Sequence, residues 1–167
     1  PALEQLVAVQ PNAENTYELG RCLLRVGEPE RAVALLGAAC ADSPDRHEWL
    51  DVLAEAQATT GRSDLARATL DRAIALDDRP RYRYDRAMCA LDLGQPDAAE
   101  SDLRRALELA PDSHPTLLQL ASLLAGDGND RSADDLNHLS TVKTGTQGLD
   151  DRRKNTRLDF TASQHTN

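Results

Sequence analysis

A period of 33 to 34 residues runs through the chain and constrains its fold more than any other feature. Four glycines mark this period, at Gly27, Gly61, Gly94 and Gly128. An alanine follows each glycine after five residues, at Ala32, Ala66, Ala99 and Ala133. Further leucines and alanines recur at fixed spacing in three copies, at Leu36, Leu70, Leu103, Ala39, Ala73 and Ala106. Such a period is typical of a small structural unit that is repeated and stacked.

Each copy of the period predicts two helices. In the segment NTYELGRCLLRVG, positions 16, 19, 20, 23 and 24 fall on one face of an α-helix. Gly27 lies just beyond this face, where a glycine adopts the left-handed conformation that ends a helix. Pro29 and Pro96 stand where a second helix would begin, and Pro44 and Pro111 stand where it would end. We therefore expect antiparallel helix pairs that approach closely through small residues.

These residues resemble the tetratricopeptide repeat family, in which Leu, a small residue, a turn glycine, Ala, a large residue, Ala and Pro stand at similar spacing. Three full copies match, at about 13–45, 47–78 and 80–111, and a fourth begins at 113. The resemblance implies an all-α fold, a right-handed α-α superhelix of antiparallel helix pairs. The chain departs from the family pattern at two positions of the repeat. Where the family has an aromatic residue, the three copies have Thr16, Leu50 and Arg83. Where the family has a tyrosine, they have Leu23, Gln57 and Ala90.

The pattern divides the chain into three parts. We expect residues 1–11 to be the second helix of a preceding repeat. Residues 12–140 are expected to form the solenoid, with three full repeats and a degenerate capping repeat in which Asn137 and Ser140 replace Leu and Ala. Residues 141–167 have no helical period and are expected to form a polar tail. Because the chain begins with Pro1, we expect a piece of a longer protein or a processed product, and the compartment stays open.

The charge of the chain narrows the classes of partner. Residues 1–128 carry 13 Arg and 22 Asp and Glu, a net charge of −9, whereas residues 129–167 are balanced. An acidic domain repels phosphate backbones, so we expect no nucleic-acid partner. No stretch of the sequence approaches the roughly 20 apolar residues of a membrane span.

No motif in the sequence predicts catalysis, a metal or a cofactor. Cys22, Cys40 and Cys89 form no CxxC pair, and the four histidines are scattered without metal-binding spacing. His47 and Glu48 are neighbours, but adjacent side chains on a helix diverge, so we expect no acid–base pair there. We therefore expect a non-enzymatic protein without a cofactor.

The resemblance implies a ligand-binding groove along the first helix of each repeat. Its positions are Tyr17, Arg21 and Arg25 in the first full copy, Glu48, Asp51 and Glu55 in the second, and Arg81, Tyr84 and Met88 in the third. The three acids of the second copy are three and four residues apart, so their carboxylates share one helix face. This acidic stripe favours a protein or peptide segment that carries Lys or Arg beside an apolar anchor. The alternative is a solvated groove in which Glu48 or Asp51 pairs with Arg21 or Arg81.

We do not expect this chain to bind a terminal carboxylate, as the chaperone-binding members of the family do. Chaperone-binding members hold a terminal carboxylate with Lys, Asn and Arg side chains, and the matching positions here are Tyr17, Arg21, Val52, Arg81 and Asp85. Only Arg81 is compatible with that role, and Asp85 would repel a terminal carboxylate. A heat-shock-type C-terminal peptide is therefore not the expected ligand.

The tail contains a basic segment of its own. The segment DDRRKNTRLDF, residues 150–160, carries Arg152, Arg153, Lys154 and Arg157 close to Leu158 and Phe160. Charge complementarity gives the hypothesis that this segment docks on the groove of its own chain or self-associates with a second copy. The alternative is an unbound tail.

These features predict a protein-interaction module that binds a peptide or a partner helix in its concave groove. Two alternatives stay open. One is an accessory or regulatory domain of a larger enzyme or secreted multidomain protein, and the other is a structural element of a self-assembling complex.

Overall fold

The computed structural model describes residue 5 and residues 12–126 of the chain. Helices in that part are α2 (Ala13–Arg25), α3 (Pro29–Asp42), α4 (His47–Thr59), α5 (Ser63–Leu76), α6 (Pro80–Asp92), α7 (Pro96–Leu109) and α8 (His114–Gly126). These described residues contain no strand, which confirms the predicted all-α fold class for them. No helix among them is long and apolar enough to cross a membrane.

The predicted segments at the two ends of the chain are not tested. Apart from residue 5, the helix expected at 1–11 lies outside the described residues, as do the second helix of the fourth copy and the tail with its basic segment. Contacts divide the chain into two units, residues 1–120 and residues 121–167. The second unit contributes only the end of α8 to the described part.

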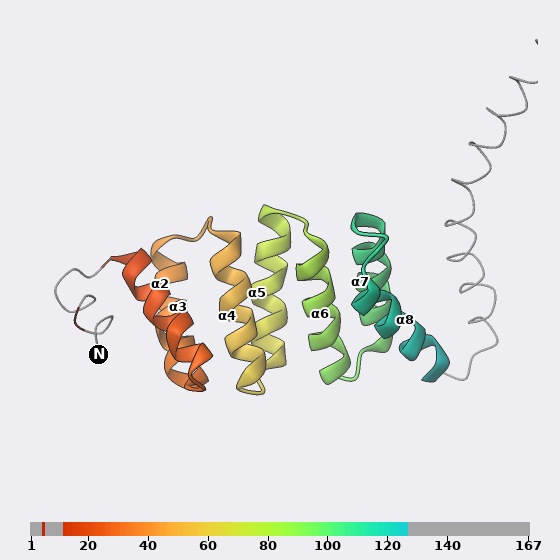
Figure 1. The fold of residues 1–167 in the computed structure, drawn as a ribbon, viewed down its shortest axis with the longest axis horizontal. Coiled ribbons are helices and arrows are strands. Elements are labelled where there is room, and N and C mark those ends of the chain that lie inside the picture. Colours follow the sequence, from red (N-terminus) through yellow and green to blue (C-terminus); the bar gives the residue numbers. More distant parts are fainter. Residues whose placement is uncertain (1–4, 6–11, 127–167) are drawn as a thin grey trace, which may run out of the picture. The chain divides into compact units, whose positions relative to one another are not determined.

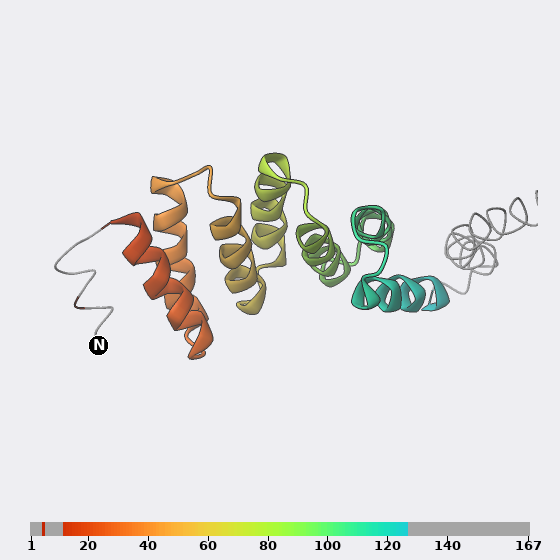
Figure 2. The ribbon, with the colours of Figure 1, turned by 45° about the horizontal axis from the view of Figure 1, so that its top comes forward.

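Within the first unit, α2 to α7 form three helix pairs that follow one another along the chain (Figure 1, Figure 2). The pairs are α2 with α3, α4 with α5, and α6 with α7, and successive pairs meet where α3 packs on α4 and α5 packs on α6. The first helices of neighbouring pairs also touch each other, α2 against α4 and α4 against α6. This packing places the predicted groove positions on neighbouring helices.

A glycine turn joins the two helices of each pair. Gly27, Gly61 and Gly94 have φ angles of 83°, 74° and 68°, a region that only a residue without a Cβ adopts readily. The amide after the first of them, at Glu28, donates a hydrogen bond of 2.9 Å to the carbonyl of Leu23. The equivalent bonds in the other two turns are also 2.9 Å long. These bonds close the last helical turn, and the predicted helix ends are confirmed.

The second helices begin and end close to the predicted prolines. Pro29 and Pro96 are the first residues of α3 and α7, where the missing N–H is not needed. Both helices end two residues before the next proline, Pro44 or Pro111. In the middle pair Asp78 replaces this proline and accepts a hydrogen bond of 2.7 Å from Arg83. Together with Arg105, this bond lowers the pKa of the Asp78 carboxyl group.

The core lies between the helices of each pair and is built from small residues. Six of the alanines that recur with the period lie in the described part of the chain and are fully buried, and Leu36, Leu70 and Leu103 fill the space beside them. Gly20 shows how close α2 and α3 are, because a Cβ placed on it would lie 2.8 Å from Leu36 Cγ and 3.2 Å from the Leu36 amide nitrogen. Small residues at these positions therefore determine the distance between paired helices.

The third pair replaces apolar contacts with buried charges. Arg83 stands at the aromatic position of the family pattern, and both Arg83 and Arg86 donate hydrogen bonds to Asp102 in α7, over 3.2 and 2.8 Å. The Asp102 side chain is only 8% exposed, and each arginine is 20% exposed. A carboxylate on the second helix thus satisfies both arginines of the first, which holds α6 and α7 together without the aromatic residue.

The close approach of α2 and α3 leads to a prediction on stability. Gly20→Ala places a Cβ 2.8 Å from Leu36, so we expect the free energy of unfolding to fall by about 1–3 kcal/mol. Gly37→Ala in α3 is the matched control, because nothing lies within 4 Å of its added Cβ. This control should gain about 0.5–1 kcal/mol from helix propensity. Urea denaturation followed by circular dichroism measures both variants, and equal stability of the two would contradict the close approach.

Candidate functional site

A cavity of about 340 Å³ lies between α4 and α6, the first helices of the second and third pairs. Its walls combine acidic side chains with apolar ones. The lining residues are Asp51, Ala54, Glu55, Ala58, Thr59, Leu70, Arg81, Asp85, Met88, Cys89 and Asp92. All of them belong to the first unit, and most follow one face of α4 or α6.

The charges in this cavity are unbalanced. Of the described residues that line it, four are carboxylates and one, Arg81, is a cation. The Arg81 Nε atom lies 3.2 Å from Asp51 Oδ2 and 3.4 Å from Asp85 Oδ2. A terminal nitrogen of the same guanidinium lies 3.7 Å from Glu55 Oε2. One positive charge is therefore shared among three carboxylates, and the cavity keeps an excess of negative charge.

Burial makes the Asp51 carboxylate unfavourable in its ionised form. Its side chain is 11% exposed. Loss of solvation raises the pKa of Asp51 from 3.8 to about 6, although Arg81 and Arg79 act in the opposite direction. Asp85 and Glu55 add to the rise by repulsion, and burial also raises the pKa of Asp85. A strongly perturbed carboxyl group in a cavity is a candidate for function.

The cavity brings together four of the nine groove positions expected from the sequence: Asp51, Glu55, Arg81 and Met88. Tyr84 is half-buried and is not among the lining residues. Glu48 is exposed at the start of α4, with its carboxylate 3.3 Å from His47 Nε2. The pair of Asp51 with Arg81 that the alternative interpretation named is present. However, the guanidinium is also close to Glu55 and Asp85, and Asp92 lines the same cavity.

The three groove positions of the first copy lie outside this cavity. Tyr17 is buried and stacks on Trp49 of α4, with ring centroids 4.6 Å apart and an angle of 8° between the planes. Arg21 forms an ion pair of 2.6 Å with Glu18 on its own helix, and Arg25 is exposed in the last turn of α2. The aromatic stacking draws Tyr17 into the contact between α2 and α4.

The expectation that the His47 and Glu48 side chains diverge is wrong. His47 is the first residue of α4, so no preceding helical turn fixes the direction of its side chain. Its Nδ1 atom lies 2.9 Å from the Tyr82 hydroxyl oxygen, and its Nε2 atom lies 3.6 Å from Asp77 and close to Glu48. The imidazole thereby links α4 to α6. Over residues 5 and 12–126, no group of three or more His, Cys, Asp or Glu side chains is arranged to hold a metal ion.

Seven lining residues were not assigned to the groove from the sequence, and those with ionisable side chains are Asp85, Cys89 and Asp92. A signal for two of them exists, because positions 81, 85, 88 and 92 continue one face of α6 at helical spacing. Cys89 is buried, and burial raises the pKa of its thiol to about 11. The thiol therefore stays protonated at neutral pH and is a poor nucleophile.

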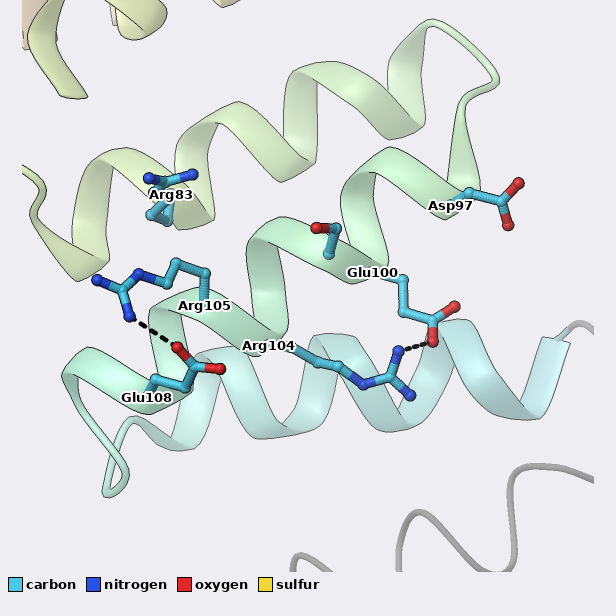
Figure 3. A pocket seen from close by; sticks show the side chains of 7 residues that line it. Arg83, Asp97, Glu100, Arg104, Arg105 and Glu108 are labelled. Carbon is cyan, nitrogen blue, oxygen red and sulfur yellow. Dashed lines mark hydrogen bonds and ion pairs between the residues drawn. The ribbon is translucent and has the colours of Figure 1, made fainter. Parts of the chain in front are cut away.

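A second cavity, of about 580 Å³, contrasts with the first (Figure 3). Its lining residues come from α7 and from Arg83 of α6, and the charged ones are three arginines and three acids. Arg105 pairs with Glu108 over 2.7 Å, and Arg104 pairs with Glu100, as Figure 3 shows. Because these lining charges balance, the surface offers no net charge to select a ligand, and it serves below as a control surface.

The repeat pattern of the chain matches a known family. Residues 1–47 and 52–114 fit the sequence pattern described as tetratricopeptide repeat. The chain belongs to the tetratricopeptide repeat family. No curated protein sequence matches this tetratricopeptide repeat protein.

Solved structures agree with this family assignment. The crystal structure of MamA matches with a TM-score of 0.77 and 19% identity, over 89% of this chain and 88% of MamA. The first tetratricopeptide repeat domain of RPAP3 (Spaghetti), bound to the HSP90 peptide SRMEEVD, matches with 0.67 and 19%, over 70% and 94%. The Yersinia enterocolitica type III secretion chaperone SycD, in complex with a peptide of the translocator YopD, matches with 0.57 and 24%, over 78% and 93%. At these identities the likeness shows the fold.

The buried carboxylate of this tetratricopeptide repeat protein leads to a prediction on pH. A carboxyl group whose pKa rises from 3.8 to about 6 on folding destabilises the folded state when it is ionised. This loss is absent well below pH 3.8, is still small at pH 4, grows as the pH rises towards 6, and is complete above it. We expect Asp51→Asn to raise the free energy of unfolding by about 1–3 kcal/mol at pH 7.5 and to change it little at pH 4.

Urea denaturation at the two pH values measures this effect. Asp97→Asn is the control, because Asp97 is exposed in the first turn of α7 and its replacement should lower stability by at most about 1 kcal/mol, the opposite sign to that expected for Asp51→Asn. An Asp51→Asn protein that is less stable than the wild type at pH 7.5 would contradict the interpretation.

Proposed function

We propose that this chain is a non-enzymatic protein-interaction module that binds a peptide or a partner helix through the cavity between α4 and α6. The observation that carries the proposal is the composition of that cavity. Within the described part of the chain, its lining holds four carboxylates, one guanidinium and several apolar side chains. These groups suit a segment that carries Lys or Arg beside an apolar residue.

A segment with Lys or Arg beside an apolar residue can make both apolar contacts and charge-assisted hydrogen bonds in this cavity. Lys and Arg have apolar stems that pack on apolar side chains while their charged ends reach polar partners. Here Ala58 and Met88 offer partly exposed apolar surface next to the buried Ala54, and the Asp85 and Glu55 carboxylates line the same cavity. Ammonium and guanidinium groups donate strong charge-assisted hydrogen bonds to carboxylates. A cation therefore gains both kinds of contact in one place.

Peptide binding occurs in other proteins with this fold. RPAP3 holds an HSP90 peptide and SycD holds a peptide of YopD, which supports a peptide ligand for this chain as well. The HSP90 peptide SRMEEVD contains three acidic residues. The excess negative charge around Asp51 and Asp85 would repel such a sequence, so we propose a ligand of the opposite charge.

Peptide arrays with the full chain test this function. The wild type should bind peptides that carry Lys or Arg next to an apolar residue, and binding should weaken as salt is added. Glu55→Lys should reduce binding at least about tenfold, because it turns an attraction into a repulsion at the cavity.

The matched control is Glu108→Lys on α7, at the second cavity. Both glutamates are well exposed, 56% for Glu55 and 64% for Glu108, so neither change disturbs the core. Glu108→Lys should bind the same peptides as the wild type. Equal binding by all three proteins would reject the cavity as the binding site.

A further inference from the structure

Arg81 occupies the cavity in the way that a ligand's cation would. Its guanidinium comes from α6 and faces Asp51 and Glu55 of α4 as well as Asp85 of its own helix. The charged group thus lies among the carboxylates that we propose as the receptor for Lys or Arg. The unliganded protein fills part of its own binding site.

Arg81 is held loosely when it is compared with the structural arginines of the same helix. Its distances to the three carboxylates are 3.2, 3.4 and 3.7 Å, and its side chain is 63% exposed. Arg86 lies 2.8 Å from Asp102. Arg83 lies 2.7 Å from Asp78 and 3.2 Å from Asp102, and each of these two arginines is only 20% exposed. A strong charge-assisted hydrogen bond is about 2.7–2.9 Å long, and exposed ion pairs contribute little to stability. The Arg81 contacts are therefore easily exchanged for others.

Arg81 also fails to neutralise the carboxylates around it. Among the lining residues that the structure describes, it faces three carboxylates, those of Asp51, Glu55 and Asp85. Asp92, at the other end of α6, adds a fourth carboxylate to the cavity. The raised pKa of Asp51 agrees with this, because burial and the neighbouring acids outweigh the attraction of the guanidinium. A cation from a partner would find carboxylates that Arg81 satisfies only in part.

We propose that Arg81 is a built-in competitor that determines the specificity of this site. A Lys or Arg side chain of a partner segment takes the position of the Arg81 guanidinium, which turns outward to solvent. This inference rests on the proposed function and adds the role of one residue to it. Arg81 then weakens binding of every single cation, so a segment binds well only when an apolar residue also packs on Met88 and the alanines.

The direction in which Arg81→Gln changes the affinity for a basic peptide distinguishes a competitor from a residue that contacts the ligand. If Arg81 is a competitor, Arg81→Gln strengthens the binding of a basic peptide, by about 3- to 10-fold for the removal of one nearby like charge. If Arg81 instead contacts an acidic group of the ligand, the same substitution weakens binding. The probe is a fluorescein-labelled peptide, Leu-Arg-Leu-Lys-Leu-Tyr, with a counterpart that carries Glu in place of Arg and Lys. Fluorescence polarisation at low salt gives the affinities.

Two variants control for charge and for folding. Arg81→Lys keeps the charge and should bind the basic peptide within about twofold of the wild type. Arg79→Gln removes an equal charge from the neighbouring exposed arginine, which pairs with Asp77 and does not line the cavity, and should change affinity less than Arg81→Gln. Circular dichroism confirms that each variant is folded. In the wild type, the NMR signal of Arg81 Nε–H should move towards its solvent-exposed position when the basic peptide is added.

The outcomes distinguish this inference from the proposed function. Stronger binding by Arg81→Gln alone supports the competitor role. Unchanged or weaker binding by Arg81→Gln, with binding still lost in Glu55→Lys, overturns the competitor role and leaves the proposed function standing. Equal strengthening by Arg79→Gln also overturns it, because the effect would then follow net charge. If no variant binds the basic peptide, both the inference and the proposed ligand chemistry are wrong.

Discussion

The close approach of the two helices in each pair determines where the other side chains of this protein lie. Fully buried alanines and Gly20 let the helices come together until Leu36 touches the opposite backbone. A larger side chain at these positions would separate the pair and shift its register. Because each pair packs on the next in a fixed register, Asp51 of α4 comes to face Arg81 of α6. The cavity exists as a consequence of this packing.

Charges in this protein act in two different ways. Asp102 is buried between two arginines that are each only 20% exposed, and it holds α6 to α7. Arg81 contacts its carboxylates at 3.2 Å or more and is 63% exposed. The first arrangement satisfies buried groups and stabilises the fold, whereas the second leaves negative charge unsatisfied. This excess of negative charge lowers the stability of the folded state, which agrees with the binding role that we propose for the cavity.

Much of the fold and part of the site could be predicted from the sequence. The repeated glycines and prolines indicated the helix ends, and the acidic stripe of α4 led to Asp51 and Glu55. Asp85 and Asp92 could have been found by following the face of α6 past Arg81. The position of Tyr17 could not, because its burial depends on Trp49, a residue of the next repeat. The same holds for the pairing of Arg83 and Arg86 with Asp102.

The sequence by itself determined the helix pairs, their turns and their spacing. These features depend on local backbone preferences: Gly27, Gly61 and Gly94 allow a positive φ, and Pro29 and Pro96 favour the first turn of a helix. Only the tertiary structure decided which charged groups meet in one cavity and how completely each is paired. Residues 51 and 81 are 30 positions apart, and the distance between their side chains depends on how α4 packs against α6. That packing also sets the solvation of Asp51, and with it the raised pKa of the Asp51 carboxyl group.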